Sequence, residues 1–240
     1  MRTVVRPERG SGTRELILST AERLFAERGV HMVSNRQVSE AAGQGNIAAV
    51  SYHFGTKADL VRAIARKHAG EMEQARVRMV TETAGSTDIR DWVACMVRPF
   101  TGHLADLGNP TWYARFGVQV MSDPALQELM IEEALTSASL RLLLVGLNQC
   151  LPSLPPTVCA ERWVMARYLI AHMCAEREHA LAEGTPTLQP SWQDLATSLI
   201  DAIAGLWLAS VTHPQGKEVH GDDSGVPDDQ GGGLPVRSVP

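Results

Sequence analysis

Three side chains of types that often bind metal ions, His172, Glu176 and His179, follow one another at intervals of four and three residues. On a helix this spacing places all three on one face, and Glu176 with His179 forms an ExxH unit like those of helical carboxylate metal centres. Such a centre needs a second ExxH unit and further carboxylates, and the sequence contains no second copy. We therefore expect neither a metal nor a cofactor, and a helical metalloprotein remains a third hypothesis.

Motifs of other catalytic chemistries are missing: the sequence holds no serine or cysteine nucleophile in a recognisable elbow, no HExxH and no P-loop. The cysteines at positions 95, 150, 159 and 174 form no CxxC pair, which is typical of buried thiols in a reducing compartment. Met1–Arg14 is too polar for a secretory leader, and the strongest apolar run, Leu142–Leu147, is too short to span a bilayer. We expect a cytoplasmic protein that is not an enzyme and has no membrane partner.

A different chemistry, recognition of a macromolecular surface, is indicated in the stretch from Ser34 to Lys57. Ser34 and Gln37 have the spacing of a capping box, in which each side chain bonds a free backbone N–H at the start of a helix. Gly43 and Gly45 are expected to end this helix and turn the chain, because glycine adopts left-handed backbone angles without penalty. The pattern predicts a short helix followed by a tight turn.

A second short helix is expected from Ile47 to Phe54, and its two faces differ. The side predicted to pack inward carries Ile47, Val50 and Phe54. The opposite side carries Ala48, Ala49 and Tyr52. Small residues let a helix approach the major groove closely, and their methyl groups can contact thymine methyls. A helix-turn-helix that reads DNA explains this face, although glycine-turn helix pairs also occur as ordinary helical hairpins.

The net charge of −5 is unevenly divided along the 240 residues. Residues 1–80 contain 13 Lys and Arg against 8 Asp and Glu, whereas residues 81–240 contain 9 against 19. The positive part is the one that holds the predicted helix-turn-helix. This asymmetry favours a basic reader of nucleic acid attached to an acidic second domain over an uneven scatter of solvated charges.

Helices are also expected on both sides of the helix-turn-helix. Residues 1–12 are interpreted as a flexible basic arm because they contain Pro and Gly breakers. Thr13 is predicted to cap a first helix that ends at about Arg28. Thr56, with an aspartate three residues later, is predicted to cap a long helix that reaches about Val80 and connects the two parts of the chain.

Three segments together resemble a known family: TRELILSTAERLFAERGV, SNRQVSEAAG and YHFGTKADLVRAI. They are similar to the N-terminal domain of the TetR family of transcriptional regulators over residues 13–68. The resemblance implies an all-α fold of about nine helices, with a three-helix DNA-binding domain followed by a larger ligand-binding and dimerisation domain over residues 69–213. Residues 214–240 are rich in Gly, Pro and Asp and are expected to be disordered.

The resemblance also implies which residues contact DNA. The start of the first helix of the pair would touch phosphates or base edges, and Ile47–His53 would read the major groove. Lys57 would bind a phosphate, where a helix N-terminus already favours an anion. The expected DNA contacts are Ser34, Asn35, Arg36, Asn46, Ala48, Ala49, Ser51, Tyr52, His53, Thr56 and Lys57.

Two features depart from the family pattern. The turn from Gly43 to Phe54 is one residue longer than usual, and Ser51 stands where members often carry a phosphate-binding tyrosine. Arg36 could also pair with Glu40, four residues further along the same helix, instead of contacting DNA. These features keep a second hypothesis open, namely a helical ligand-binding or scaffolding protein without DNA binding.

The rest of the chain is expected to form helices over residues 89–104, 112–120, 123–152, 156–183 and 191–211. Aromatic and soft side chains with a few polar anchors are spread over the middle helices, which suits a pocket for a small organic molecule. Each of them could equally belong to the core. The candidate pocket residues are Trp92, Met96, Phe100, His103, Trp112, Tyr113, Arg115, Phe116 and Trp163.

The last two helices, about 156–183 and 191–211, are each apolar over a broad face. In the family such a pair packs against its twin in a four-helix dimer interface, although intramolecular packing would also cover these faces. Two recognition helices one DNA turn apart, about 34 Å, would read a palindrome. We expect a homodimeric repressor that binds a double-stranded DNA operator and is released by a small-molecule effector. An activator, or a repressor without a ligand, also fits the sequence.

Overall fold

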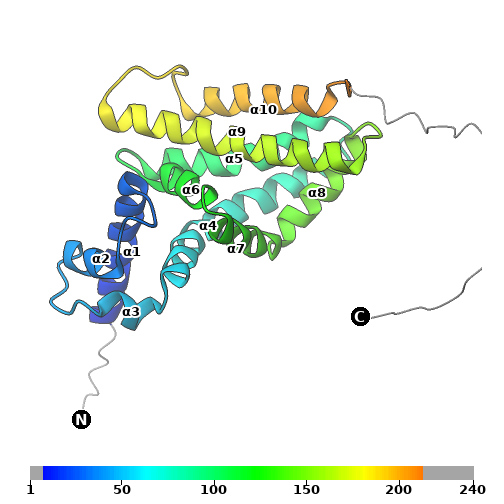
Figure 1. Ribbon diagram of the computed structural model, residues 1–240. Helices are drawn as coiled ribbons and strands as arrows, with labels where there is room; N and C mark the ends of the chain where they lie inside the picture. The colour runs from blue at the N-terminus through cyan, green and yellow to red at the C-terminus, as the bar shows by residue number, and fades with distance from the viewer. Residues whose placement is uncertain (1–7, 213–240) are drawn as a thin grey trace, which may run out of the picture. The chain divides into compact units, whose positions relative to one another are not determined.

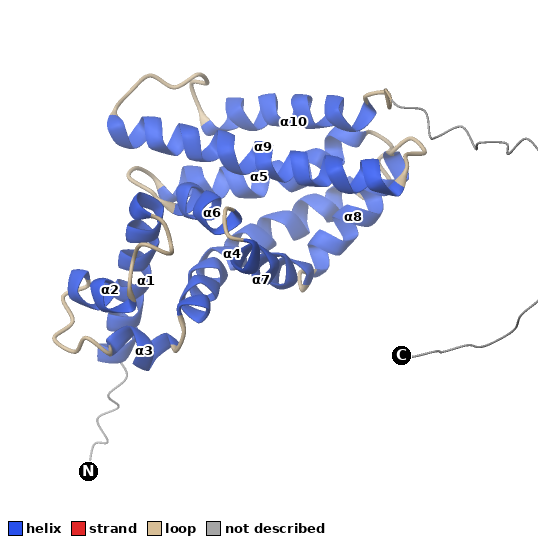
Figure 2. Ribbon diagram, viewed as in Figure 1, coloured by secondary structure: helices blue, strands red, loops and turns tan. Residues whose placement is uncertain are grey.

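Ten α-helices and no strand form the part of the chain that the computed structural model describes, residues 8–212 (Figure 1, Figure 2). The expected all-α fold is confirmed, and the ten helices belong to one compact unit that ends at Ala209. The expected C-terminal tail and the first seven residues of the expected basic arm lie outside the described residues. The helices are α1 (Glu8–Arg28), α2 (Asn35–Ala41), α3 (Ala49–Phe54), α4 (Lys57–Thr83), α5 (Ile89–Leu107), α6 (Tyr113–Met121), α7 (Pro124–Leu135), α8 (Ala138–Cys150), α9 (Pro156–Glu183) and α10 (Trp192–Leu208).

The structure has one helix more than the sequence predicted, because the segment expected as a single helix over 123–152 is divided. α7 ends at Leu135, and α8 begins at Ala138. Ser137 is the N-cap of α8, and its Oγ accepts the N–H of Leu140 at 3.0 Å. A side chain that satisfies a free N–H in this way favours a new helix start over a continuous helix.

The start of α1 also differs from the prediction. The helix begins at Glu8 instead of Thr13, so the last residues of the expected flexible arm are helical. Gly10 and Gly12 in this turn each cost about 1 kcal/mol relative to alanine, which is too little to stop a helix nucleated by the residues that follow.

α6 packs against both α1 and α9 and lies between them (Figure 1). Phe25 of α1 is fully buried and stacks on Phe116 of α6 with 6.3 Å between ring centroids. α4 continues from the end of α3 to its packing against α5, α7 and α8. These contacts join the N-terminal helices to the rest of the unit through a shared apolar core.

α5 lies between α10 and the α4–α8 side of the molecule, and its contact with α8 is unusually close. A Cβ atom on Gly146 of α8 would overlap the ring of Trp92 of α5. Trp92 also donates its indole N–H to the carbonyl of Ser86 at 3.0 Å. Gly146 therefore permits the approach of these two helices. Within residues 8–212, none of the helices has the length and apolar composition needed to cross a bilayer.

Candidate nucleic-acid interface

The first helix of the predicted helix-turn-helix begins as its sequence indicates. Ser34 Oγ accepts the N–H of Gln37 at 3.2 Å, and Gln37 Oε1 accepts the N–H of Ser34 at 2.8 Å. This capping box confirms the predicted start of α2. Gly43 has a φ of +64°, which confirms a left-handed residue directly after the helix.

A buried serine that the sequence analysis did not single out holds α3 against α2. Ser39 is fully buried, and its Oγ accepts the N–H of Val50 at 3.3 Å. This bond satisfies a backbone donor at the start of α3, where no helical partner exists. The signal available in the sequence was a serine next to Val38, on the face of α2 that packs inward.

The exposed face of α3 differs in part from the predicted one. Tyr52 is 83% exposed, and Ala48 and Ser51 are also on the surface. Ala49 was expected to face outward but is buried at 7% exposure, so its methyl group belongs to the core. Ile47 was expected to face inward but is 56% exposed. The prediction is wrong for these two residues.

The error has a local cause in the turn before α3. Asn46 Oδ1 accepts the N–H of Ala48 at 2.9 Å, and the N–H of Ala49 donates to the carbonyl of Asn46 at 3.0 Å. The helix thus starts at Ala49 instead of Ile47. Because the helical period begins two residues later, Ile47 no longer shares a face with Val50.

The third element of the interface is the start of α4. Thr56 and Asp59 form the predicted capping box, with the Asp59 N–H donating to Thr56 Oγ1 at 3.1 Å. Hydrogen bonds from Thr56 hold the pKa of the Asp59 carboxyl below its ordinary value. Lys57 is half-buried, and its Nζ donates to the carbonyl of Val30 at 3.0 Å. Since an ammonium group has three donors, two of them remain for a phosphate.

Two arginines flank α3. Arg36 pairs with Glu40 at 2.7 Å, so the ion pair considered from the sequence is present on the exposed side of α2. Arg14 lies with its guanidinium 4.9 Å from the ring centroid of Phe54. Arg14 was not among the predicted contacts, because its position beside α3 depends on the packing of α1 and no local motif marks it.

Most of the expected DNA contacts are accessible. Seven of the eleven are exposed, three are half-buried and one is buried. The exposed residues are Ser34, Arg36, Asn46, Ala48, Ser51, Tyr52 and Thr56; the half-buried ones are Asn35, His53 and Lys57; the buried one is Ala49. Exposed hydroxyl, amide and guanidinium groups on α2, on α3 and at the start of α4 can donate to phosphates and base edges.

The expected pocket residues lie in several different places. Four of them form an aromatic cluster: Phe100, His103, Tyr113 and Phe116. The ring centroids of the other three lie 5.8 to 6.3 Å from the centroid of the Tyr113 ring. Trp163 packs instead edge-on against Trp207 at 5.0 Å. Trp92 contacts Gly146, whereas Met96 and Trp112 are half-buried and pack against the core.

Arg115, expected as a polar anchor of the pocket, is held by a buried carboxylate. Glu178 of α9 is 1% exposed and accepts the N–H groups of Ala114 and Arg115 at 3.0 and 2.9 Å. It also accepts Arg115 Nε at 3.0 Å. A carboxylate at this position accepts hydrogen bonds from N–H groups that have no partner within α6, and its negative charge interacts favourably with the positive end of the helix dipole. Glu178 therefore anchors α6 to α9.

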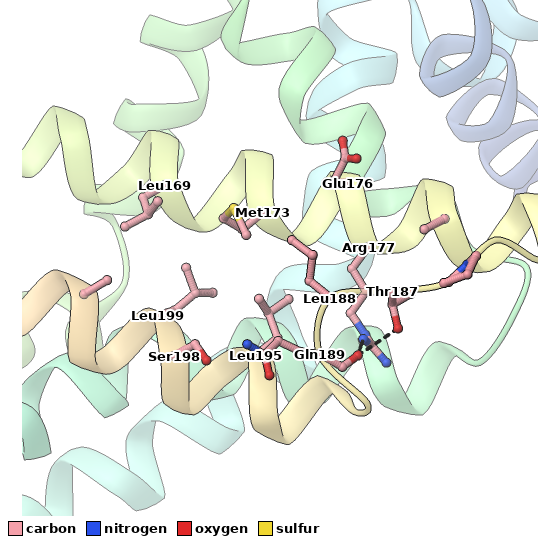
Figure 3. A pocket seen from close by; sticks show the side chains of 13 residues that line it. Leu169, Met173, Glu176, Arg177, Thr187, Leu188, Gln189, Leu195, Ser198 and Leu199 are labelled. Atoms are coloured by element: carbon pink, nitrogen blue, oxygen red, sulfur yellow. Dashed lines mark hydrogen bonds between the residues drawn. The ribbon is translucent and has the colours of Figure 1, made fainter.

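A shallow groove of about 270 Å³ runs between α9, α10 and the connection that joins them (Figure 3). Leu169, Met173 and Leu199 line it, and Leu188 of the connecting segment is highly exposed at its edge. Arg177 holds this segment by donating to the carbonyl of Pro190 at 3.1 Å. None of the candidate pocket residues lines this groove.

The residues of the metal hypothesis are on the outer side of α9. His172 is exposed and stacks on Tyr168 with 5.7 Å between ring centroids. In the part of the chain that the structure describes, no three His, Cys, Asp or Glu side chains are grouped in a way that could hold a metal ion. The helical metalloprotein hypothesis thus gains no support.

A capped helix, a glycine turn, an exposed second helix and a capped third helix define the class of helix-turn-helix DNA-binding proteins. Residues 17–64 match the family model described as bacterial regulatory proteins, tetR family. This domain is thus similar to the DNA-binding domain of the TetR family, as the sequence resemblance predicted. The proteins that this model describes are transcriptional regulators, and the match covers the helix-turn-helix and the helices next to it.

Individual relatives extend the comparison. The HTH-type transcriptional repressor AcnR of Corynebacterium glutamicum is 35% identical over 72 residues, and this match spans 30% of the chain but only 38% of AcnR. The crystal structure of the TetR-family transcriptional regulator PfmR from Thermus thermophilus covers 78% of the chain and 96% of its own length, with a TM-score of 0.50 and 17% identity. The likeness to PfmR extends the family fold beyond the N-terminal domain.

Proposed function

We propose that the chain is a homodimeric transcriptional repressor that binds a palindromic DNA operator in the cytoplasm and is released from it by a small-molecule effector. The observation that carries the proposal is the exposed face of α3, where Tyr52 is 83% exposed on a helix held by Ser39 and flanked by two capping boxes. A large aromatic side chain left in solvent on a fixed helix is suited to contact with a partner surface.

Dimerisation through α9 and α10 is supported by what these helices expose. α9 presents Val164, Met165 and Tyr168, which are 37 to 50% exposed. α10 presents small side chains at helical spacing, at Ser198, Ala202 and Gly205. An apolar surface beside a row of small residues permits close packing of helices from a second copy.

Release from DNA requires that the effector bind better to a state in which the two recognition helices are wrongly spaced. α6 provides a physical connection for such a change, because it packs on α1 and is anchored to α9 by Glu178. A shift of α6 relative to α9 would therefore be transmitted to α1, the helix that supports the DNA-binding elements. Two-state coupling of this kind is typically worth about 1–3 kcal/mol.

Selection of genomic fragments with the purified full chain tests the proposal. The expected result is a palindromic site whose half-sites are centred about one helical turn, or a multiple of it, apart. Tyr52→Ala should weaken binding to the selected site by about tenfold, as expected for loss of a contact worth about 1–3 kcal/mol. Met32→Ala, at an exposed apolar residue in the turn between α1 and α2, is the control. Failure to enrich any sequence would refute the regulator function.

The oligomeric state is measured separately by sedimentation. Met165→Glu places a charge on the exposed apolar face of α9 and should convert the dimer to a monomer. Leu142→Glu, at an exposed leucine of α8, is the control and should leave the dimer unchanged. A wild-type chain that sediments as a monomer at micromolar concentration would contradict the dimer.

A further inference from the structure

A second hollow, of about 530 Å³, lies between α4, α7 and α8, with Tyr113 of α6 in its wall. This size falls within the range of small-molecule sites, roughly 300–1,000 Å³. Its walls are largely apolar, and the small side chains among them leave the space open. The apolar lining residues are Ala65, Ala69, Gly70, Met72, Met130, Ala134, Ala138 and Leu140.

The acidic side chains of this cavity already have their partners. Glu73 Oε2 accepts Ser137 Oγ at 2.6 Å, Ser139 Oγ at 2.7 Å and Arg76 Nη1 at 3.1 Å. Glu133 accepts two hydrogen bonds from Arg66 of α4, which does not line the cavity. A cationic ligand would therefore find no free carboxylate among these residues.

The basic side chain, in contrast, has donors to spare. Arg76 is largely buried, and its only hydrogen bond among the described residues uses Nη1 to reach Glu73. Its Nε is buried without any partner. Burial lowers the pKa of Arg76 by more than the neighbouring Glu73 carboxylate raises it. The Glu73 carboxylate thus only partly offsets the cost of burying the guanidinium charge. The edge of a guanidinium group is well suited to bind a carboxylate through two parallel hydrogen bonds.

Tyr113 supplies a second free donor in the same wall. The residue is 8% exposed, and its hydroxyl makes no hydrogen bond within residues 12–212. Burial raises the pKa of this hydroxyl above its ordinary value, so it keeps its proton at neutral pH. A phenolic hydroxyl that makes no hydrogen bond to these residues can donate its proton to a ligand oxygen in the cavity that Tyr113 lines.

We propose that this cavity binds an apolar monocarboxylate, whose carboxylate accepts hydrogen bonds from Arg76 and from the Tyr113 hydroxyl and whose apolar body lies among the alanines and methionines of α4, α7 and α8. Binding itself depends only on the cavity. That the acid is the effector rests on the proposed function.

Contacts of Tyr113 indicate how the acid would act on the DNA-binding helices. The Tyr113 ring stacks on His68 at 3.9 Å between centroids. His68 bonds Glu22 of α1 at 3.0 Å and His103 of α5 at 2.8 Å. A ligand that draws the Tyr113 hydroxyl toward Arg76 would move a ring in direct contact with the His68–Glu22 pair, which joins α4 to α1.

Calorimetry with the full chain tests the site without DNA. The probes are octanoate, decanoate, dodecanoate and phenylbutanoate, each compared with the alcohol and the amine of the same skeleton. At least one acid should bind about tenfold or more tightly than its alcohol, as expected for a charge-assisted pair of hydrogen bonds, and the amines should bind most weakly. If no acid binds more tightly than its alcohol, the proposed site is wrong.

Variants assign the preference to particular groups. Arg76→Met should abolish the preference for the acid, and Tyr113→Phe, which removes only an unbonded hydroxyl, should reduce acid affinity severalfold while the fold is kept. Glu73→Gln should tighten acid binding, because it removes the carboxylate that competes for Arg76. Arg78→Met, which changes an arginine on the same helix outside this cavity, should have no effect. Unchanged acid affinity in both Arg76→Met and Tyr113→Phe would overturn the assignment.

Gel shifts with and without the acid separate this inference from the proposed function. An acid that binds the cavity and releases the operator confirms both. Binding without release overturns the effector role and leaves the site, whereas a chain that binds operator but no acid retains the proposed function and loses the inference.

Discussion

The helix-turn-helix and the C-terminal part of the molecule differ in the kind of buried polar atom that lacks a hydrogen-bond partner, an acceptor in the first and donors in the second. In residues 34–59, backbone donors at helix starts are paired through Ser34, Asn46 and Thr56, and the one buried side-chain atom without a partner is Asn35 Oδ1. Over residues 65–209 the buried atoms without a partner are the donors Arg76 Nε, Arg167 Nε, Arg177 Nε and Trp207 Nε1, whereas His103 Nδ1 pairs with Glu71 at 3.0 Å.

This difference indicates that the two parts of the chain are organised in different ways. The N-terminal helices have their geometry fixed before any partner arrives, as a surface that must match DNA requires. The C-terminal part carries unsatisfied donors, each of which costs free energy that a ligand or a second subunit can restore. Stability should therefore respond differently to changes in the two parts.

The largest expected effect tests whether the two parts unfold together. Phe25→Ala removes a fully buried ring that stacks on Phe116, so it should cost about 3–5 kcal/mol of unfolding free energy. Urea unfolding followed by circular dichroism should give one transition, shifted as a whole. If two transitions appear and only one of them shifts, the two parts unfold independently. The contributions of their polar groups to stability could then not be compared on one scale.

The next effect concerns the contact of α5 with α8. Gly146→Ala forces its new methyl group against the Trp92 ring and should destabilise the protein by about 1–3 kcal/mol, the usual cost of overpacking. Gly117→Ala is the control, because a Cβ there meets no atom within 4 Å. The control should be neutral or stabilising by up to about 1 kcal/mol, since alanine favours a helix more than glycine does. Thermal unfolding of both variants measures the contrast.

A pH effect is expected from the His103 cluster. Burial, and then the neighbouring His68, lower the pKa of His103, while Glu71 and Asp106 oppose the shift. Because the unfolded chain then binds a proton more readily than the folded one, stability should fall as pH drops through the ordinary histidine pKa of about 6.5, by at most about 1.4 kcal/mol per pH unit. His103→Gln should flatten this dependence between pH 7.5 and 5.5, and His172→Gln, at an exposed histidine, should not.

The last prediction concerns DNA affinity, and its variant is the one whose free energy of unfolding should change least. Lys57→Ala should weaken binding to specific and non-specific DNA alike and reduce the slope of log affinity against log salt by about one, as expected for one phosphate contact. Lys67→Ala removes a lysine that pairs with Glu15 and serves as the control. An unchanged salt slope in Lys57→Ala would mean that the Lys57 ammonium stays on the Val30 carbonyl when DNA binds.

The starts of α2 and α4 were predicted well because their signals are local. Ser34 with Gln37 and Thr56 with Asp59 each cap a helix as expected. Such pairs lie within one turn of the chain, so no knowledge of tertiary packing is needed to recognise them. The break at Ser137 was missed, because the apolar pattern continues across it.

The faces of α3 and the cavity could be predicted only in part. The hydrogen bonds of Asn46 place the start of α3 two residues later than predicted, so Ile47 is exposed and Ala49 is buried, the reverse of the prediction. Tyr113 was identified as a candidate pocket residue, but Arg76 was not, because its position opposite α7 and α8 depends on how α4 packs. Residues that come into contact only in the folded protein cannot be recognised from the residue spacing within one segment.

The anchoring of α6 has a consequence for building hybrid regulators. Glu178 fixes the first turn of α6 to α9, while Phe116 of the same helix stacks on Phe25 of α1. A DNA-binding domain exchanged at the start of α4 would bring a new α1 onto an α6 shaped for a different neighbour. A hybrid that takes its first three helices from one relative should therefore also take the residues of α6 that face α1, so that the exchanged helices pack correctly on the rest of the protein.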